Sequence, residues 1–198
     1  MNKYLETQRE AMDSLVAQAD AETDPHRQAI LRNYYRHMSL EISGRWDEFV
    51  YDHDTMMAEH PEYIVKFGTP DTVLYHGIKG VEDFYNTIDQ SVVMLQAHET
   101  AVADWGFSSR LILTSQMTGA ALTAAGMTSA DIGMEIEPDA VYAMEDMTVV
   151  QFWRYDSRAR LTGEELYQVD PPKAIVKVDP ENIATKQDVN ASLKHIIG

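Results

Sequence analysis

The sequence predicts an α+β fold in which N-terminal helices pack against a curved antiparallel sheet. Apolar residues recur at helical spacing in the first part of the chain, whereas most of residues 96–169 consists of β-type runs separated by turns. Helices segregated from a run of antiparallel strands are typical of the α+β class. A curved sheet folded around helices encloses a cavity at its open end, so we expect a pocket there.

Two helices are expected before the first strand. Residues 3–19 are compatible with a helix throughout. The second helix has clear ends, because Asp24 is a suitable N-cap, Pro25 fits the first turn and Gly44 follows the last one. Its apolar stripe leads to a carboxylate, through Ile30, Tyr34, Met38 and Glu41. A short amphipathic segment follows, with apolar residues Trp46, Phe49, Val50, Met56 and Met57.

The hydrophobic period then changes to that of strands. The segments EYIVKF (62–67) and TVLYHG (72–77) predict a hairpin around a turn at 68–71. Gly80 is expected to precede a helix, whose apolar side runs from Val81 to Ile88. Four further strands are expected at 96–107, 110–118, 140–155 and 160–169, with a loop at 119–133 that contains a helical turn at most.

Residues 171–198 are expected to form a C-terminal arm beside a main domain of residues 1–170. The arm has four lysines against three acidic residues, a net charge of +1, which leaves −17 for the main domain. Pro171 and Pro172 mark the boundary because neither can continue a sheet ladder. Beyond them, AIVKV (174–178) predicts a short strand, and Asp179-Pro180 predicts the start of a terminal helix. We expect the arm to pack on the main domain or on a partner subunit.

Composition excludes several classes of function. The net charge of −16 argues against binding to nucleic acid or to an anionic membrane surface. The absence of cysteine excludes disulfides, thiolate metal sites and a cysteine nucleophile. The histidines at 53 and 60 fit no metal-ligand spacing, so no metal is expected. No apolar run is long enough to span a bilayer, and the N-terminus lacks the apolar core of a signal peptide, so a cytoplasmic location is expected.

Three stretches resemble the SnoaL-like polyketide cyclase family of the nuclear-transport-factor-2-like superfamily: YYRHMSLEISGRWDEF (34–49), LYHGIKGVEDFY (74–85) and TGEELYQVD (162–170). The motif residues within them are Glu41 with Trp46-Asp47, Gly80-Val81 with Phe84-Tyr85, and Glu164 with Tyr167. The resemblance covers residues 26–170 and implies a cone-shaped sheet around a cofactor-free pocket. Relatives include cyclases, isomerases, dehydratases and epoxide hydrolases, as well as pocket proteins without catalytic activity.

Glu41 and His98 form the first candidate catalytic pair. Glu41 shares the buried stripe of its helix, where a carboxylate is costly unless it has a partner or a raised pKa. The resemblance to dehydratases implies that such an acidic residue holds a histidine, and His98 lies where they place it. The alternatives are a helix-end ion pair of Glu41 with His37 or Arg45, and a simply exposed His98.

Three further candidates are Asp146, Glu165 and His60. Asp146 and Glu165 lie on otherwise apolar strand faces, and a bulge would replace them with their neighbours Glu145 and Glu164. The resemblance to isomerases implies a base near His60, which is expected just before the first strand. The side chains expected to line the pocket are Tyr34, Trp46, Met57, Tyr63, Tyr75, Phe84, Trp153 and Tyr167.

The leading hypothesis is a cofactor-free enzyme that acts on a small, largely apolar carbonyl or hydroxyl compound by general acid–base catalysis. It would be a dehydratase, isomerase or aldol-type cyclase. A non-catalytic binding or assembly subunit is the first alternative. An epoxide hydrolase is the second, and it would need Arg110 or Arg154 to point inward. We expect a homodimer or higher homo-oligomer in each case.

Overall fold

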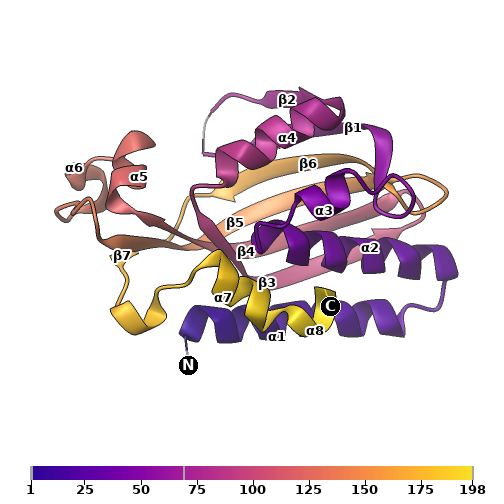
Figure 1. Cartoon of the computed structure of the whole chain (residues 1–198), viewed down its shortest axis with the longest axis horizontal. Coiled ribbons are helices and arrows are strands. Elements are labelled where there is room, and N and C mark those ends of the chain that lie inside the picture. The colour runs from indigo at the N-terminus through magenta and orange to yellow at the C-terminus, as the bar shows by residue number, and fades with distance from the viewer. Residues whose placement is uncertain (1, 69, 198) are drawn as a thin grey trace.

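The structure, a computed structural model, describes residues 2–68 and 70–197 (Figure 1). The first elements are α1 (Lys3–Ala21), α2 (Pro25–Ile42), α3 (Asp47–Val50), β1 (Met57–Lys66), β2 (Val73–His76) and α4 (Gly77–Ile88). The next are β3 (Val92–Ala103), β4 (Gly106–Thr118), α5 (Gly119–Ala124), α6 (Ser129–Ile132), β5 (Val141–Tyr155) and β6 (Leu161–Asp170). The last are β7 (Ala174–Lys177), a 3-10 helix (Pro180–Asn182), α7 (Lys186–Ser192) and α8 (Lys194–Ile197).

One curved sheet carries the fold, in the strand order β2-β1-β6-β5-β4-β3 with β7 paired to β5. Neighbouring strands are antiparallel except β1 and β6, which run parallel. In Figure 1, α1 and α2 lie together along one side of the sheet, α4 lies beside β2, and α5 and α6 form one end of the molecule. The α+β prediction, with N-terminal helices against a curved sheet, is confirmed.

Helix α2 begins and ends where the sequence predicts. The Asp24 carboxylate accepts hydrogen bonds from the backbone N–H groups of His26 and Arg27, which completes the N-cap. Gly44 has a φ of 72°, the left-handed conformation that follows many helix ends. The stripe is buried, and the Tyr34 ring packs 4.0 Å from Phe107 of β4, measured between ring centroids. This packing fixes α2 against the inner face of the sheet.

Several boundary predictions are wrong. The turn between β3 and β4 lies at residues 104–105 and not at 108–109, and β3 begins at Val92, four residues before the expected start. Helix α4 begins at Gly77 and includes Gly80, where a Cβ atom would lie 2.9 Å from the backbone carbonyl carbon of Tyr75. Strand β1 begins at Met57, five residues before the expected start. The terminal helix begins at Lys186, because a reciprocal capping box between Thr185 and Asp188 starts it there. Residues 180–182 form only a 3-10 turn.

The segment after Pro171 packs against the rest of the chain. Strand β7 pairs with residues 142–145 of β5, next to the stretch of β5 that pairs with β6. The buried Gln116 amide of β4 donates to the carbonyl oxygen of Asn182 (3.0 Å) and accepts from the N–H of Ala184 (2.9 Å). Val189 and Leu193 are fully buried. No helix in the described parts of the chain is long and apolar enough to cross a bilayer.

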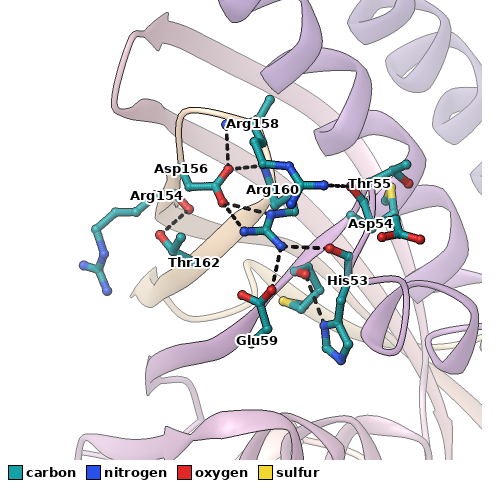
Figure 2. A network of polar contacts seen from close by, with 12 residues as sticks. His53, Asp54, Thr55, Glu59, Arg154, Asp156, Arg158, Arg160 and Thr162 are labelled. Atoms are coloured by element: carbon teal, nitrogen blue, oxygen red, sulfur yellow. Dashed lines mark hydrogen bonds and ion pairs between the residues drawn. The ribbon is translucent and has the colours of Figure 1, made fainter.

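A polar network fastens the turn between β5 and β6 to the segment that precedes β1 (Figure 2). The Arg160 guanidinium donates to the Asp156 carboxylate (2.9 Å), to the carbonyl oxygen of His53 (2.8 Å) and to the Glu59 carboxylate (3.0 Å). On the strand that follows, the Thr162 hydroxyl donates to the carbonyl oxygen of Arg154 (3.0 Å). The network therefore fixes the start of β6.

Candidate active site

A cavity of about 490 Å³ lies between the inner face of the sheet, α2 and α4. This volume is in the range of pockets that hold small organic molecules. Most of the lining side chains are apolar or aromatic, including Phe84, Trp153 and the four methionines Met38, Met117, Met127 and Met144. The polar exceptions are few, and two of them are the carboxylates Glu41 and Glu164.

Glu164 is the most deeply buried carboxylate of the site. It lies on β6 opposite Trp153 of β5, and only 2% of the residue is exposed. Burial raises its pKa well above 4.5, the negative charge of Glu41 raises it further, and the indole N–H of Trp153 partly offsets both. Burial therefore favours the protonated form of Glu164, in which the group can donate a proton or a hydrogen bond.

A bulge in β6 turns Glu164 inward. Tyr155 pairs with Leu161 and Arg154 pairs with Gly163, so Thr162 is an extra residue in β6. Leu161 and Glu164 are three positions apart, yet both are buried on the inner side because of this extra residue. The alternative raised in the sequence analysis, in which Glu164 replaces Glu165, is the one that the structure contains.

Glu41 lies in the last turn of α2, and its side chain is 16% exposed. Its Oε2 atom is 3.5 Å from Nε2 of His37, one helical turn earlier. The same His37 nitrogen is 2.9 Å from the Tyr85 hydroxyl, which is 3.2 Å from the Tyr63 hydroxyl. Burial lowers the pKa of His37, which favours its neutral form, and the imidazole is placed to orient the Glu41 side chain.

Gln151 adds a second polar position to the inner wall. It is buried on β5, two residues before Trp153, and its amide donates to the Tyr34 hydroxyl over 2.9 Å. Burial raises the pKa of Tyr34, which keeps the phenol neutral. Ser115 of β4 also lines the cavity. These groups supply hydrogen bonds but no charge.

The predicted pocket residues fall into three groups. Tyr75, Phe84 and Trp153 line the cavity. Tyr34, Tyr63 and Met57 are fully buried in the surrounding core, while Trp46 stacks on Tyr85 and lines a small pocket next to Glu41. Tyr167 lies outside the cavity, and its hydroxyl donates to the Glu165 carboxylate over 2.9 Å.

Three of the proposed catalytic residues point away from the cavity. Glu165 forms an ion pair with Arg154 on the outer face of β6. Asp146 has a φ of 56° in a bulge of β5 and faces Lys173, 3.4 Å away, so the expected strand alternation is broken there. His60 is exposed within β1.

His98 has neighbours other than Glu41. Its Nδ1 atom is 3.2 Å from the Thr100 hydroxyl, and its ring faces the backbone of Ala11 in α1. Burial lowers its pKa. Glu41 contacts His37 instead, which is the helix-end alternative considered from the sequence. Among the described residues that line the cavity, Glu41 is present and His98 is not.

The described residues contain neither a metal cluster nor an inward arginine at this site. No group of three or more histidine or acidic side chains in the described chain is arranged to hold a metal ion. Arg110 faces Glu99 (3.8 Å) and Arg154 pairs with Glu165, and no arginine lines the cavity within the described ranges.

Comparisons with known proteins support the fold. No family model and no curated protein matches the chain. Among solved structures, a candidate polyketide cyclase from Xanthomonas campestris pv. campestris matches with a TM-score of 0.50 and 12% identity, over 72% of this chain and 91% of that one. The chain has the nuclear-transport-factor-2-like cone fold. The cone fold implied by the sequence resemblance is thus confirmed.

Two other solved structures with this architecture match at lower scores. One is a nuclear-transport-factor-2-like protein of unknown function from Mesorhizobium loti, with 13% identity and a TM-score of 0.46, over 75% of this chain and 98% of that one. The other is a candidate SnoaL-like polyketide cyclase from Shewanella putrefaciens, with 13% identity and a TM-score of 0.46, over 77% and 85%. At such identities the similarity concerns the fold and not the reaction.

Proposed function

We propose that the protein is a cofactor-free acid–base enzyme of the lyase or isomerase type. Its substrate would be a small, largely apolar carbonyl or hydroxyl compound, and the reaction a dehydration, an isomerisation or an aldol-type cyclisation. The observation that carries the proposal is the pairing of Glu41 and Glu164 in one apolar cavity. A carboxyl group whose pKa is raised by burial, as that of Glu164 is, can act as an acid beside a second carboxyl group that acts as a base.

The two carboxyl groups would have different roles. Glu164, protonated because of its burial, would donate to the oxygen of the substrate. Glu41 would accept a proton from carbon, with His37 as its positioning residue. Gln151 would bind the substrate oxygen. Such proton transfers contribute roughly 10²–10⁴-fold to a rate, so substrate positioning and the exclusion of water would have to supply the rest.

This proposal is preferred to the two alternatives for specific reasons. A structural or non-catalytic cavity could be filled or lined by apolar groups alone, whereas this cavity contains two carboxyl groups and the Gln151 amide. Epoxide hydrolysis was expected to require an inward arginine, and Arg110 and Arg154 are both engaged on the outer face. The homo-oligomer stays a prediction, and its test is the molar mass in solution by light scattering.

Solvent deuterium exchange tests the proposal without knowledge of the natural substrate. The protein is incubated in D₂O with a panel of apolar cyclic ketones and β-hydroxyketones, and deuterium at the carbon next to the carbonyl is followed by NMR. We expect exchange with at least one compound, and a loss of about a hundredfold in Glu41→Gln and in Glu164→Gln. Glu99→Gln, an exposed carboxylate change on β3, is the matched control.

The same assay separates the two acid–base pairs. If His98→Ala abolishes exchange while Glu164→Gln retains it, the pair predicted from sequence is correct and the proposed one is wrong. If the wild type gives no exchange and no elimination with any compound, the binding-protein alternative is favoured.

A further inference from the structure

The described lining of the cavity has acidic side chains but no basic ones. Those described residues include Glu41 and Glu164 but no lysine, arginine or histidine. Lys186 lines the small pocket next to Glu41 and not this cavity, and its ammonium group donates to the carboxylate and the carbonyl oxygen of Asp89. The acidic groups therefore lack a cationic partner in the described protein.

Both carboxyl groups also have unused hydrogen-bonding capacity. Oε2 of Glu41 and Oε2 of Glu164 are buried without a hydrogen-bond partner among the described residues. Glu164 itself is 2% exposed and forms part of the cavity wall. A buried acceptor that lacks a donor is costly, so a ligand that supplies donors there gains affinity.

The surrounding titratable groups cannot supply a positive charge. They are Tyr34 and His37 of α2, Tyr63 of β1, Tyr85 of α4 and Tyr155 of β5. Burial raises the pKa of each of these tyrosines and lowers that of the histidine, so all of them are neutral near pH 7. A cation at this position has to come from a ligand.

We propose that the cavity binds hydrophobic primary amines in their ammonium form, with the charged group between Glu41 and Glu164 and the apolar body against the aromatic and methionine side chains. An ammonium group has three donors, which suits two carboxyl groups and the Gln151 amide oxygen. The net charge of −16 favours the approach of cations over that of anions.

The apolar lining selects an organic ammonium ion in preference to a small cation. Contact with an inorganic ion would not bury the apolar surface of Phe84, Tyr75 and the methionines. An alkyl or polycyclic amine would bury it, and that burial favours binding. The inference uses the cavity of the proposed function but does not depend on turnover. An amine of this class would compete with a neutral substrate for the same space.

The test is isothermal calorimetry with probes that share one apolar body. The probes are adamantylmethylamine, adamantylmethanol and adamantanecarboxylate, and methylamine carries the charge without the body. We expect the adamantyl amine to bind at least tenfold more tightly than the alcohol, which is about 1.4 kcal/mol, with the carboxylate and methylamine weakest. Glu41→Gln and Glu164→Gln should each remove most of this preference, whereas Glu99→Gln should retain it.

A second measurement remains informative if a variant folds poorly. In wild-type protein, amine binding should release protons from Glu164, measured as a dependence of the binding heat on the ionisation enthalpy of the buffer, and alcohol binding should not. The inference is wrong if the amine does not bind, or if the alcohol binds as tightly as the amine. Equal proton exchange for both probes, or an unchanged preference in both carboxyl variants, would also overturn it. Failure of the deuterium-exchange assay would leave these binding results unaffected.

Discussion

Replacing Glu164 with glutamine should make the protein more stable at neutral and alkaline pH, by an amount that grows with pH. The folded protein holds this carboxyl group in a site that raises its pKa well above 4.5. The unfolded chain releases the proton near pH 4.5, whereas the folded protein keeps it. Below that pH the carboxyl group is protonated in both states, so its ionisation does not affect the free energy of unfolding. As pH rises from there through the folded pKa, stability is lost.

The size of the effect follows from the number of protons involved. One proton bound by the folded state and absent from the unfolded state changes the free energy of unfolding by about 1.4 kcal/mol per pH unit. Glutamine has nearly the same shape as glutamate, but it does not titrate. The stability difference between Glu164→Gln and wild type should therefore increase by up to about 1.4 kcal/mol for each pH unit.

Urea denaturation followed by tryptophan fluorescence, between about pH 5 and pH 8, measures this difference directly. Because the buried histidines titrate in both proteins, their contribution largely cancels in the comparison. Glu99→Gln, exposed on the outer face, should give a difference that is flat with pH. A flat difference for Glu164→Gln, or a variant that loses stability relative to wild type as pH rises, would refute the assignment of a protonated Glu164.

Three further predictions concern the framework. Arg160→Met should destabilise the protein by about 2–4 kcal/mol, since it leaves Oδ2 of Asp156 and the carbonyl oxygen of His53 without their side-chain donor. Arg158→Met, at an exposed position, should cost under about 1 kcal/mol in the same urea titration. Leu193→Ala should cost about 2–4 kcal/mol because this side chain of the C-terminal arm is fully buried in the core. An unchanged melting temperature would mean that the arm is a loose appendage. The stability of the wild-type protein should decrease as pH falls below about 6.5. Burial lowers the pKa values of His37 and His98, so the unfolded chain takes up protons that the folded protein does not bind. In urea denaturation at several pH values, His98→Gln should make this decrease in stability less steep.

Local sequence signals predicted the elements that depend on local interactions. Helix α2 begins at its Asp24 cap and ends before Gly44 because both signals act within one turn. The β-type runs after residue 92 all form strands, since alternating and apolar runs of that length suit a half-buried sheet. The start of the terminal helix was misplaced because this segment contains two candidate N-caps, Asp179 and Thr185. The Thr185 box, with two reciprocal hydrogen bonds, starts the helix, whereas Asp179 makes no side-chain cap.

The candidate site was only partly predictable. Glu41 was found because its place on the helical stripe is fixed by the period of α2. The neighbours of His98 depend on α1 covering β3, a tertiary contact that the strand's own sequence does not specify. Gln151 was missed, although it alternates with Trp153 on β5 and so shares its inward face.

The choice between Glu164 and Glu165 shows where strand periodicity stops being informative. A single extra residue reverses the face of every residue beyond it, and β6 has that residue at Thr162. One signal was present in the sequence: Gly163 interrupts an otherwise regular strand, which is typical of a bulge, and a Cβ atom there would lie 2.7 Å from the carbonyl oxygen of Glu62.

The extra residue is also held in place from outside the cavity. Arg160, two residues earlier, anchors the strand start to the Asp156 carboxylate and the carbonyl of His53, and the Thr162 hydroxyl bonds the carbonyl of Arg154 across the hairpin (Figure 2). If β6 lost its bulge, the outward Glu165 would have to enter the cavity and Glu164 would leave it. The identity of the buried acid therefore depends on a polar network that does not line the cavity, and the chemistry of the site is specified by the pairing of two strands as much as by the residues that face the ligand.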